Sequence, residues 1–185
     1  MVNIEIEYKV MVNKDDFCLL LEKFIGCPYK LFIQTNYYYD TKDNLVNKNK
    51  LSLRIRNIEN NNSFILTLKE KQKNVNKEYE NIVSSINDFN FSKEAMEVLN
   101  KYKIKQEDLY LTGSLKTYRL EFIYKGGLLC FDYNLYNNIK DFEIEFESYD
   151  ITHATETVNS LLDKYNVKYE KSPLSKQARA LNKKG

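Results

Sequence analysis

Hydrophobic and polar residues alternate with a period of two along much of this chain, as they do in strands that have one apolar face. The alternating segments are rich in Ile, Val, Phe, Tyr and Thr. They occur at about residues 2–12, 30–40, 50–58, 63–70, 76–86, 115–125, 127–136 and 140–149. The pattern therefore predicts eight strands.

Four segments have helical spacing instead, at about residues 15–25, 92–103, 152–165 and 174–182. Ser92 and Thr152 are the predicted N-caps of the second and third helices, because a hydroxyl there can accept a hydrogen bond from an unpaired backbone amide. Strands dominate this pattern. The predicted fold class is therefore α+β, mainly β.

Short polar turns link most neighbouring strands, which makes the neighbours antiparallel. The predicted turns are Asn57 to Asn62, Lys73 to Asn76, Lys125-Gly126-Gly127 and Asn137-Asn138. Eight antiparallel strands can close into a barrel, and closure removes the exposed edges of an open sheet. Because no linker rich in Pro, Gly or Ser divides the chain, we expect a single domain over residues 1–185.

Charged residues keep to one face of these strands, because side chains two residues apart point the same way. In the first strand Glu5, Glu7 and Lys9 share a face, and the residues between them are apolar or aromatic. The corresponding positions in later strands are Arg54, Arg56, Lys69, Glu78, Glu80, Arg119, Asp132, Glu143, Glu145 and Glu147.

Two interpretations fit such faces. For any single strand, the charges could form the solvated exterior of an ordinary sandwich. Taken together, however, the key positions of several strands carry only carboxylates, as at Glu78 and Glu80, or only arginines, as at Arg54 and Arg56. Like charges repel unless a counter-charge lies between them. A divalent cation and a polyphosphate would supply it. We therefore favour a closed eight-stranded antiparallel β-barrel, or tunnel, with a charged interior and helices packed on the outside.

Composition limits the expected partners, the cysteine chemistry and the cellular location. The net charge is only +2, from 28 basic and 26 acidic residues, which does not favour a nucleic-acid or membrane partner. Three cysteines without a CxxC pair argue against a disulfide framework and a structural zinc site. There is no signal peptide pattern and no long apolar run. We expect a cytoplasmic protein that binds no DNA and no membrane, as a monomer or homodimer.

The available chemistry is that of carboxylates and cations. Oxygen ligands favour Mg²⁺ or Mn²⁺ over zinc, and arginines bind phosphate in a bidentate manner. The single histidine, His153, falls at a helix start, and no GxxxxGK[ST] loop is present. The predicted metal ligands are Glu5, Glu7, Glu143 and Glu145, with Asp132 as a possible addition. The predicted phosphate contacts are Lys9, Arg54, Arg56 and Lys69.

Several motifs resemble the CYTH, or triphosphate tunnel metalloenzyme, superfamily. Glu5 to Lys9 is similar to its ExExK signature, and Gln34 to Thr41 to its NxYYDT-type segment. Leu53-Arg54-Ile55-Arg56 and Leu66-Thr67-Leu68-Lys69 are similar to its LRxR and TLK strands, and Ser175 to Ala180 to its SKxxRA tail.

The resemblance implies roles for further residues. Glu78 and Glu80 would lie near a possible second metal, Arg119 and Lys176 would contact phosphate, and Tyr37 with Lys69 would position or deprotonate water. Relatives often place a second basic residue two positions before Arg119, where this chain has Thr117. Lys116 should point away from that face unless a bulge intervenes.

The resulting prediction is a metal-dependent hydrolase that releases phosphate from a triphosphate-containing small molecule, inorganic tripolyphosphate first, or thiamine or nucleoside triphosphate. Two alternatives stay open: a class IV-type adenylyl cyclase that makes cyclic AMP from ATP, and a non-catalytic module that binds polyphosphate or nucleotide. The sequence does not decide the substrate, Mg²⁺ against Mn²⁺, one metal against two, or the oligomeric state.

Overall fold

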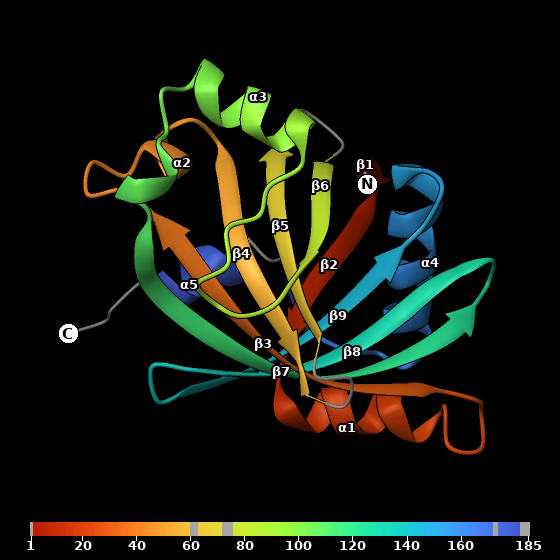
Figure 1. The fold of residues 1–185 in the computed structure, drawn as a ribbon. Coiled ribbons are helices and arrows are strands. Elements are labelled where there is room, and N and C mark those ends of the chain that lie inside the picture. The colour runs from red at the N-terminus through yellow and green to blue at the C-terminus, as the bar shows by residue number, and fades with distance from the viewer. Residues whose placement is uncertain (1, 60–62, 72–75, 172–173, 182–185) are drawn as a thin grey trace. The chain divides into compact units, whose positions relative to one another are not determined.

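The computed structural model describes residues 2–59, 63–71, 76–171 and 174–181. The chain forms two compact units, whose helices and strands are labelled in Figure 1. Unit 1 consists of Met1–Glu5, Gln34–Leu115 and Lys176–Gly185, and unit 2 of Ile6–Ile33 and Lys116–Ser175. Two long strands, β3 (Lys30–Asp40) and β7 (Tyr110–Tyr124), contribute residues to both. This division into two units does not test the prediction of a single domain, which stays a prediction.

Unit 1 is built on an antiparallel sheet with the strand order β1-β6-β5-β4-β3. The strands besides β3 are β1 (Val2–Glu5), β4 (Leu51–Ile58), β5 (Ser63–Lys71) and β6 (Asn76–Val83). The helices are α2 (Leu45–Lys48), α3 (Lys93–Lys101) and α5 (Lys176–Leu181), with a 3-10 turn η2 at Gln106–Asp108.

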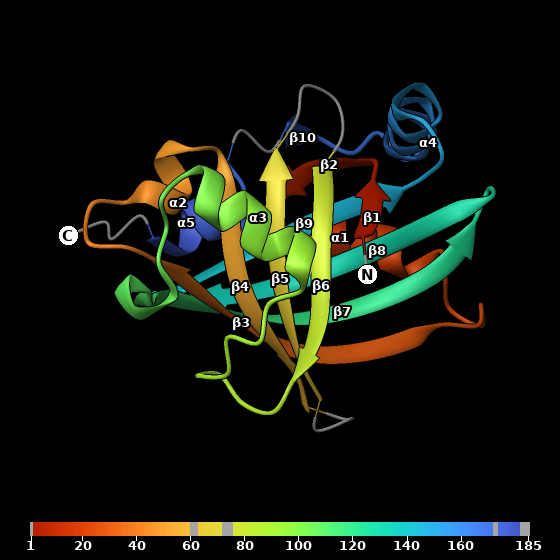
Figure 2. The same cartoon turned by 45° about the horizontal axis from the view of Figure 1, so that its top comes forward.

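Helix α3 covers the apolar face of β4, β5 and β6 (Figure 2). Leu99 of this helix is buried with Leu53, Ile55 and Leu66 of the sheet, so the alternating apolar residues make the core as predicted. Ser92 is the N-cap of α3, and its hydroxyl accepts a hydrogen bond from the Ala95 amide at 3.3 Å. Both predictions are confirmed.

Unit 2 has the strand order β7-β8-β9-β2-β10. Strand β2 pairs antiparallel with β9 and β10, and β8 pairs antiparallel with β7 and β9. These strands are β2 (Glu7–Val12), β8 (Gly127–Tyr136), β9 (Ile139–Glu147) and β10 (Tyr169–Lys171). The helices are α1 (Lys14–Glu22) and α4 (Ile151–Lys164). Within the described residues, no helix combines the length and the apolar character needed to cross a membrane.

Both helices of unit 2 pack on the apolar side of its sheet. Phe17 of α1 and Leu161 of α4 are buried in one cluster with Phe131 of β8 and Phe146 of β9. The predicted cap at Thr152 was wrong.

Asp150 caps α4, because its carboxylate accepts from the His153 amide at 2.8 Å. Thr152 lies inside the helix. The expectation that helices cover the apolar strand faces holds in each unit.

The predicted closed barrel of eight strands was wrong in number and in closure. The sheet has ten strands, and in the described residues its hydrogen-bonding order begins at β1 and ends at β10 without joining. The segment predicted at residues 2–12 is interrupted at Ile6, because β1 pairs with β6 whereas β2 pairs with β9. The other additional strand, β10, is only three residues long, too short to show a period.

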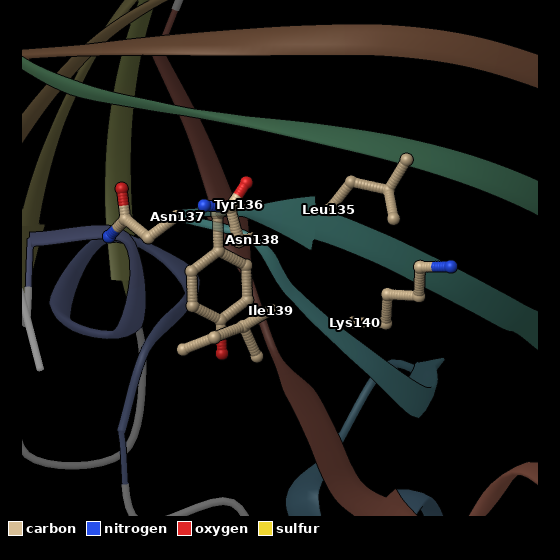
Figure 3. Close-up of a pocket in the computed structure, with 6 residues that line it drawn as sticks. All are labelled: Leu135, Tyr136, Asn137, Asn138, Ile139 and Lys140. Atoms are coloured by element: carbon tan, nitrogen blue, oxygen red, sulfur yellow. The ribbon is translucent and has the colours of Figure 1, made fainter.

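A two-residue turn joins β8 to β9 (Figure 3). Asn137 and Asn138 both have positive φ angles, 46° and 60°, as a type I′ hairpin turn requires. This turn was predicted from sequence, and the residues around it, Leu135 to Lys140, line a shallow hollow. The central residues of the predicted turns Asn57 to Asn62 and Lys73 to Asn76 lie outside the described residues.

Gly127 is the tightest glycine position in unit 2. A Cβ atom there would overlap the Glu147 carbonyl oxygen and lie 2.5 Å from Phe146 Cζ. Gly127→Ala should lower the free energy of unfolding by about 1–3 kcal/mol, measured by urea denaturation. Gly113→Ala is the control, because its Cβ would meet the movable end of Leu181 at 3.0 Å. Equal losses in the two variants would contradict this account.

Candidate active site

Four neighbouring strands of unit 1 align one row of polar side chains. In the antiparallel register Tyr38 of β3 is paired with Arg54 of β4, Arg54 with Thr67 of β5, and Thr67 with Glu80 of β6. The Thr67 hydroxyl donates to Glu80 Oε1 at 3.2 Å. Directly paired residues share a face of the sheet, so this row lies opposite the apolar core beneath α3.

A second row of unit 1 is an ion-pair cluster. The Lys69 ammonium lies 2.5 Å from Glu5 Oε2 and 2.6 Å from Glu78 Oε1. The Asn76 side-chain amide also donates to Glu5 Oε2, at 3.3 Å. The structure thus brings together Glu5, Lys69 and Glu78, all three predicted from sequence.

Arg54 is the cation that balances these carboxylates. Burial by itself lowers the pKa of its guanidinium, but Glu78, Glu5 and Glu80 raise that pKa above the ordinary value. Conversely, burial raises the pKa of the Glu78 carboxyl, but Arg54 and Lys69 bring it below the ordinary value. Arg54 Nε is buried without a hydrogen-bond partner among the described residues. Both groups therefore carry charge at neutral pH.

The structure places Tyr38, and not the predicted Tyr37, among the basic residues. Tyr37 is paired with Ile55 and packs against the apolar cluster of unit 1. The Tyr38 side chain is only 2% exposed. Burial raises the pKa of its hydroxyl, and the neighbouring charges of Arg54, Lys176, Arg56 and Arg179 oppose that rise. Because residues 37–39 are all tyrosines, the sequence did not show which of them faces the charged side of the sheet. That depends on which residues of β3 point to each face.

Two further arginines of unit 1, Arg56 and Arg179, interact with residues of β3. Arg56 Nε donates to Asn36 Oδ1 at 3.1 Å, and Asn36 is 1% exposed. Arg179 of α5 acts on Tyr38 alongside Lys176. Sequence reasoning placed Arg179 in a motif but gave it no role. Its spacing of three residues from Lys176 on one helix was the available signal.

The end of the NxYYDT-type segment has a structural function. Asp40 accepts hydrogen bonds from the backbone amides of Thr41, Val46 and Asn47 at 2.8, 2.9 and 3.1 Å. It is 1% exposed and fixes the start of α2. The carboxylate is therefore committed to the backbone and is not part of the charged face.

Tyr38→Phe should reduce turnover far more than Tyr37→Phe, because only the Tyr38 hydroxyl lies near the basic side chains. We expect a loss of about 10²-fold or more in kcat for Tyr38→Phe, the lower end for removing a group that positions or deprotonates the nucleophile. The measurement is phosphate release from tripolyphosphate, with circular dichroism to confirm that both variants are folded. A larger loss in Tyr37→Phe would reverse the assignment.

Arg119 is the centre of the charged face of unit 2. Its Nε and Nη2 atoms donate to the two carboxylate oxygens of Asp132, each at 2.7 Å. Nη2 also donates to Glu145 Oε2, and Nη1 lies 3.8 Å from Glu147 Oε1. Burial lowers the Arg119 pKa, but Asp132 and Glu145 raise it well above the ordinary value. Arg119, predicted to contact phosphate, is directed at carboxylates here.

Three carboxylates of β8 and β9 on this face are buried, whereas the Glu147 side chain is 37% exposed. Asp132 and Glu143 are 0% exposed and Glu145 is 3% exposed. This rules out a solvated exterior face for β8 and β9.

The Lys9 ammonium lies 2.6 Å from Glu7 Oε1 and 3.8 Å from Glu145 Oε1. The structure therefore brings Lys9, Glu7 and Glu145 together on adjacent strands.

Thr117 occupies the position where relatives often have a second cation. It is fully buried, its hydroxyl donates to Asn134 Oδ1 at 2.7 Å, and the Asn134 amide donates to Asp141 Oδ1 at 2.9 Å. Lys116 faces away as predicted, with its ammonium 5.4 Å from the centre of the Tyr118 ring. Because Lys116 pairs regularly with Leu135, no bulge restores the cation.

Cys130, paired with Glu145 across the strands, is a buried thiol. Burial raises its pKa, an effect that Arg119 opposes and Glu145 reinforces. The thiol thus stays protonated and serves as a small packing group.

Comparison with known proteins now decides the family. Residues 3–180 match the CYTH domain family. The chain belongs to the CYTH domain family. The resemblance to this family that the sequence motifs indicated is therefore confirmed.

Two relatives share almost a third of their residues with this CYTH domain. One is "Putative triphosphatase YjbK" of Bacillus subtilis (strain 168), 31% identical over 168 residues, or 89% of this chain and 87% of the relative. The other is the crystal structure of a "putative adenylate cyclase (bh2851)" from Bacillus halodurans. It is 32% identical with a TM-score of 0.81, and covers 96% of this chain and 97% of that one.

A second structure, HpAC1 from Hippeastrum, shows that the fold extends beyond close sequence similarity. It has a TM-score of 0.79 at 20% identity, and covers 94% of this chain and 93% of that one. At this identity the likeness concerns the fold alone.

Proposed function

We propose that this CYTH domain protein is a divalent-metal-dependent triphosphatase that releases phosphate from a small triphosphate, with inorganic tripolyphosphate as the first candidate. The observation that carries the proposal is that each unit holds carboxylates and cations together on one face of its sheet, largely shielded from solvent. Phosphate transfer depends mostly on positioning and on charge stabilisation, which such faces provide.

The donor set fits Mg²⁺ or Mn²⁺. The candidate ligands offer only carboxylate oxygens, which are the atoms that hard divalent cations bind. When bound, the ion would neutralise phosphate charge and orient the phosphate chain. The residues assigned to it are Glu5, Glu7, Asp132, Glu143 and Glu145, with Glu78 and Glu80 for a possible second ion.

The cations would bind the phosphates. Arg54 and Arg56 present planar guanidinium groups suited to bidentate contact, whereas Lys9 and Lys176 act as point charges. Lys69 and Tyr38 would orient the attacking water. Arg119 would hold Asp132 and Glu145 in position, since its donors are already directed at them.

The relatives support hydrolysis at this level. The name of YjbK gives it as a putative triphosphatase, and a dominant triphosphatase activity is described for HpAC1. Thiamine and nucleoside triphosphates are the further candidate substrates. A cytoplasmic location and a monomeric or homodimeric state stay predictions.

A class IV-type adenylyl cyclase is the second candidate, because bh2851 carries an adenylate cyclase name at 32% identity. Hydrolysis and cyclisation differ in which phosphorus is attacked, so the products of ATP separate them. Cyclic AMP with diphosphate would favour the cyclase, and ADP with phosphate the triphosphatase.

The test is a panel of tripolyphosphate, thiamine triphosphate and ATP, each incubated with Mg²⁺ or Mn²⁺, with products resolved by chromatography. We expect phosphate from at least one substrate and none in excess chelator. Tight substrate binding without any product, under both metals, would instead identify a non-catalytic binding module.

A further inference from the structure

Lys69 lies between carboxylates from two other strands of unit 1. Its ammonium contacts Glu5 Oε2 of β1 at 2.5 Å and Glu78 Oε1 of β6 at 2.6 Å. Its own strand, β5, pairs directly with β6, where Lys69 is opposite Glu78. Lys69 is thus the shared counter-ion of two acidic groups that would otherwise repel each other.

The same oxygens are the ones that a divalent cation would seek. The side chains of Lys69, Glu5 and Glu78 are 16%, 19% and 8% exposed, so the cluster is shielded but open to a small ion. An ammonium and a divalent cation cannot both lie within bonding distance of one carboxylate oxygen without strong repulsion. Binding of the ion at Glu5 should therefore displace Lys69.

Release of Lys69 would leave no stranded charge in the sheet. Glu78 keeps the cation Arg54, which lowers its pKa together with Lys69. Glu5 keeps the Asn76 amide as a donor at 3.3 Å. The Lys69 ammonium would then be available to a phosphate oxygen, the natural partner of a point charge.

We propose that Lys69 is an internal counter-ion of Glu5 and Glu78 that competes with divalent cations for these carboxylates, so that binding of the ion at Glu5 frees the Lys69 ammonium for the substrate phosphates. The inference rests on the proposed function and adds an order of events: the ion binds, and Lys69 is then free to contact the phosphates. Because binding free energies are reciprocal, metal and triphosphate should strengthen each other's binding.

Mn²⁺ binding measured by isothermal titration calorimetry tests the competition without any turnover. Lys69→Met should bind Mn²⁺ about tenfold more tightly than wild type, because the competing charge is gone. Lys69→Arg, which keeps the charge, should bind close to wild type. Lys101→Met is the matched control, since Lys101 pairs with Glu70 at 3.9 Å on the surface. Unchanged or weaker Mn²⁺ binding by Lys69→Met overturns the proposal.

Amine acetylation followed by mass spectrometry reports on Lys69 itself. Mg²⁺ alone should raise the acetylation rate of Lys69 severalfold and leave Lys101 unchanged, and added tripolyphosphate should lower the Lys69 rate again. A Lys69 rate that Mg²⁺ leaves unchanged or lowers would overturn the displacement step.

The two proposals fail separately. Hydrolysis of a triphosphate without the changes in Mn²⁺ binding and Lys69 acetylation would support the triphosphatase proposal and overturn the counter-ion role. Those changes without hydrolysis would support the counter-ion role and overturn the triphosphatase proposal.

Discussion

Replacing Arg119 by Met should lower the free energy of unfolding by about 3–5 kcal/mol, the cost of breaking a buried ion pair by removing one partner. Arg119 makes a bidentate contact with Asp132 at 2.7 Å and also binds Glu145. Asp132 is fully buried, so its carboxylate would lose this bidentate contact away from water. Urea denaturation at neutral pH gives the value.

Two variants make this result specific. Arg119→Lys keeps the charge but lacks the fork that meets both oxygens of Asp132, so it should lose an intermediate amount. Lys116→Met removes a cation from the opposite face of the same strand, where Lys116 lies over Tyr118. A loss in Arg119→Met no larger than in Lys116→Met would show that the cluster contributes nothing to stability.

Replacing Arg54 by Met should reduce kcat/KM for triphosphate hydrolysis by about 10²–10³-fold, the range seen when one preorganised donor to a developing charge is removed. Arg54 is central in the row from Tyr38 to Glu80, and its Nε makes no hydrogen bond within the described part of the chain. Its guanidinium is therefore the best-placed group for phosphate in unit 1. Steady-state phosphate release at saturating Mg²⁺ measures the loss.

Arg54→Lys should recover only part of the activity, because an ammonium cannot make the bidentate contact. Lys48→Met, an exposed change in α2, is the control for a lost positive charge. Hydrolysis by Arg54→Met within a factor of about three of wild type would remove Arg54 from the proposed phosphate site, since that is under 1 kcal/mol.

The period-two pattern predicted which charged side chains share a face, because it depends only on strand geometry. It placed Arg54, Lys69 and Glu78 on one face, and the antiparallel register of β4, β5 and β6 confirms this. It could not show the break at Ile6, since the alternation continues through that residue while the pairing partner changes.

Other features depend on contacts that a linear pattern does not contain. The choice of Tyr38 over Tyr37 follows from the register between β3 and β4. The directing of Arg119 toward Asp132 and Glu145 follows from side-chain conformation. The pairing of β1 with β6 and of β2 with β9 follows from long-range contacts, whereas the sequence showed only one continuous segment.

Hydrolysis of tripolyphosphate in ¹⁸O-labelled water, with Mg²⁺ or Mn²⁺, tests the central claim most directly. Attack by water on a terminal phosphorus predicts one ¹⁸O atom in each orthophosphate released and none in the diphosphate, with no release in excess chelator. Folded protein that binds the metal and yet releases no labelled orthophosphate from tripolyphosphate, thiamine triphosphate or ATP would contradict the account.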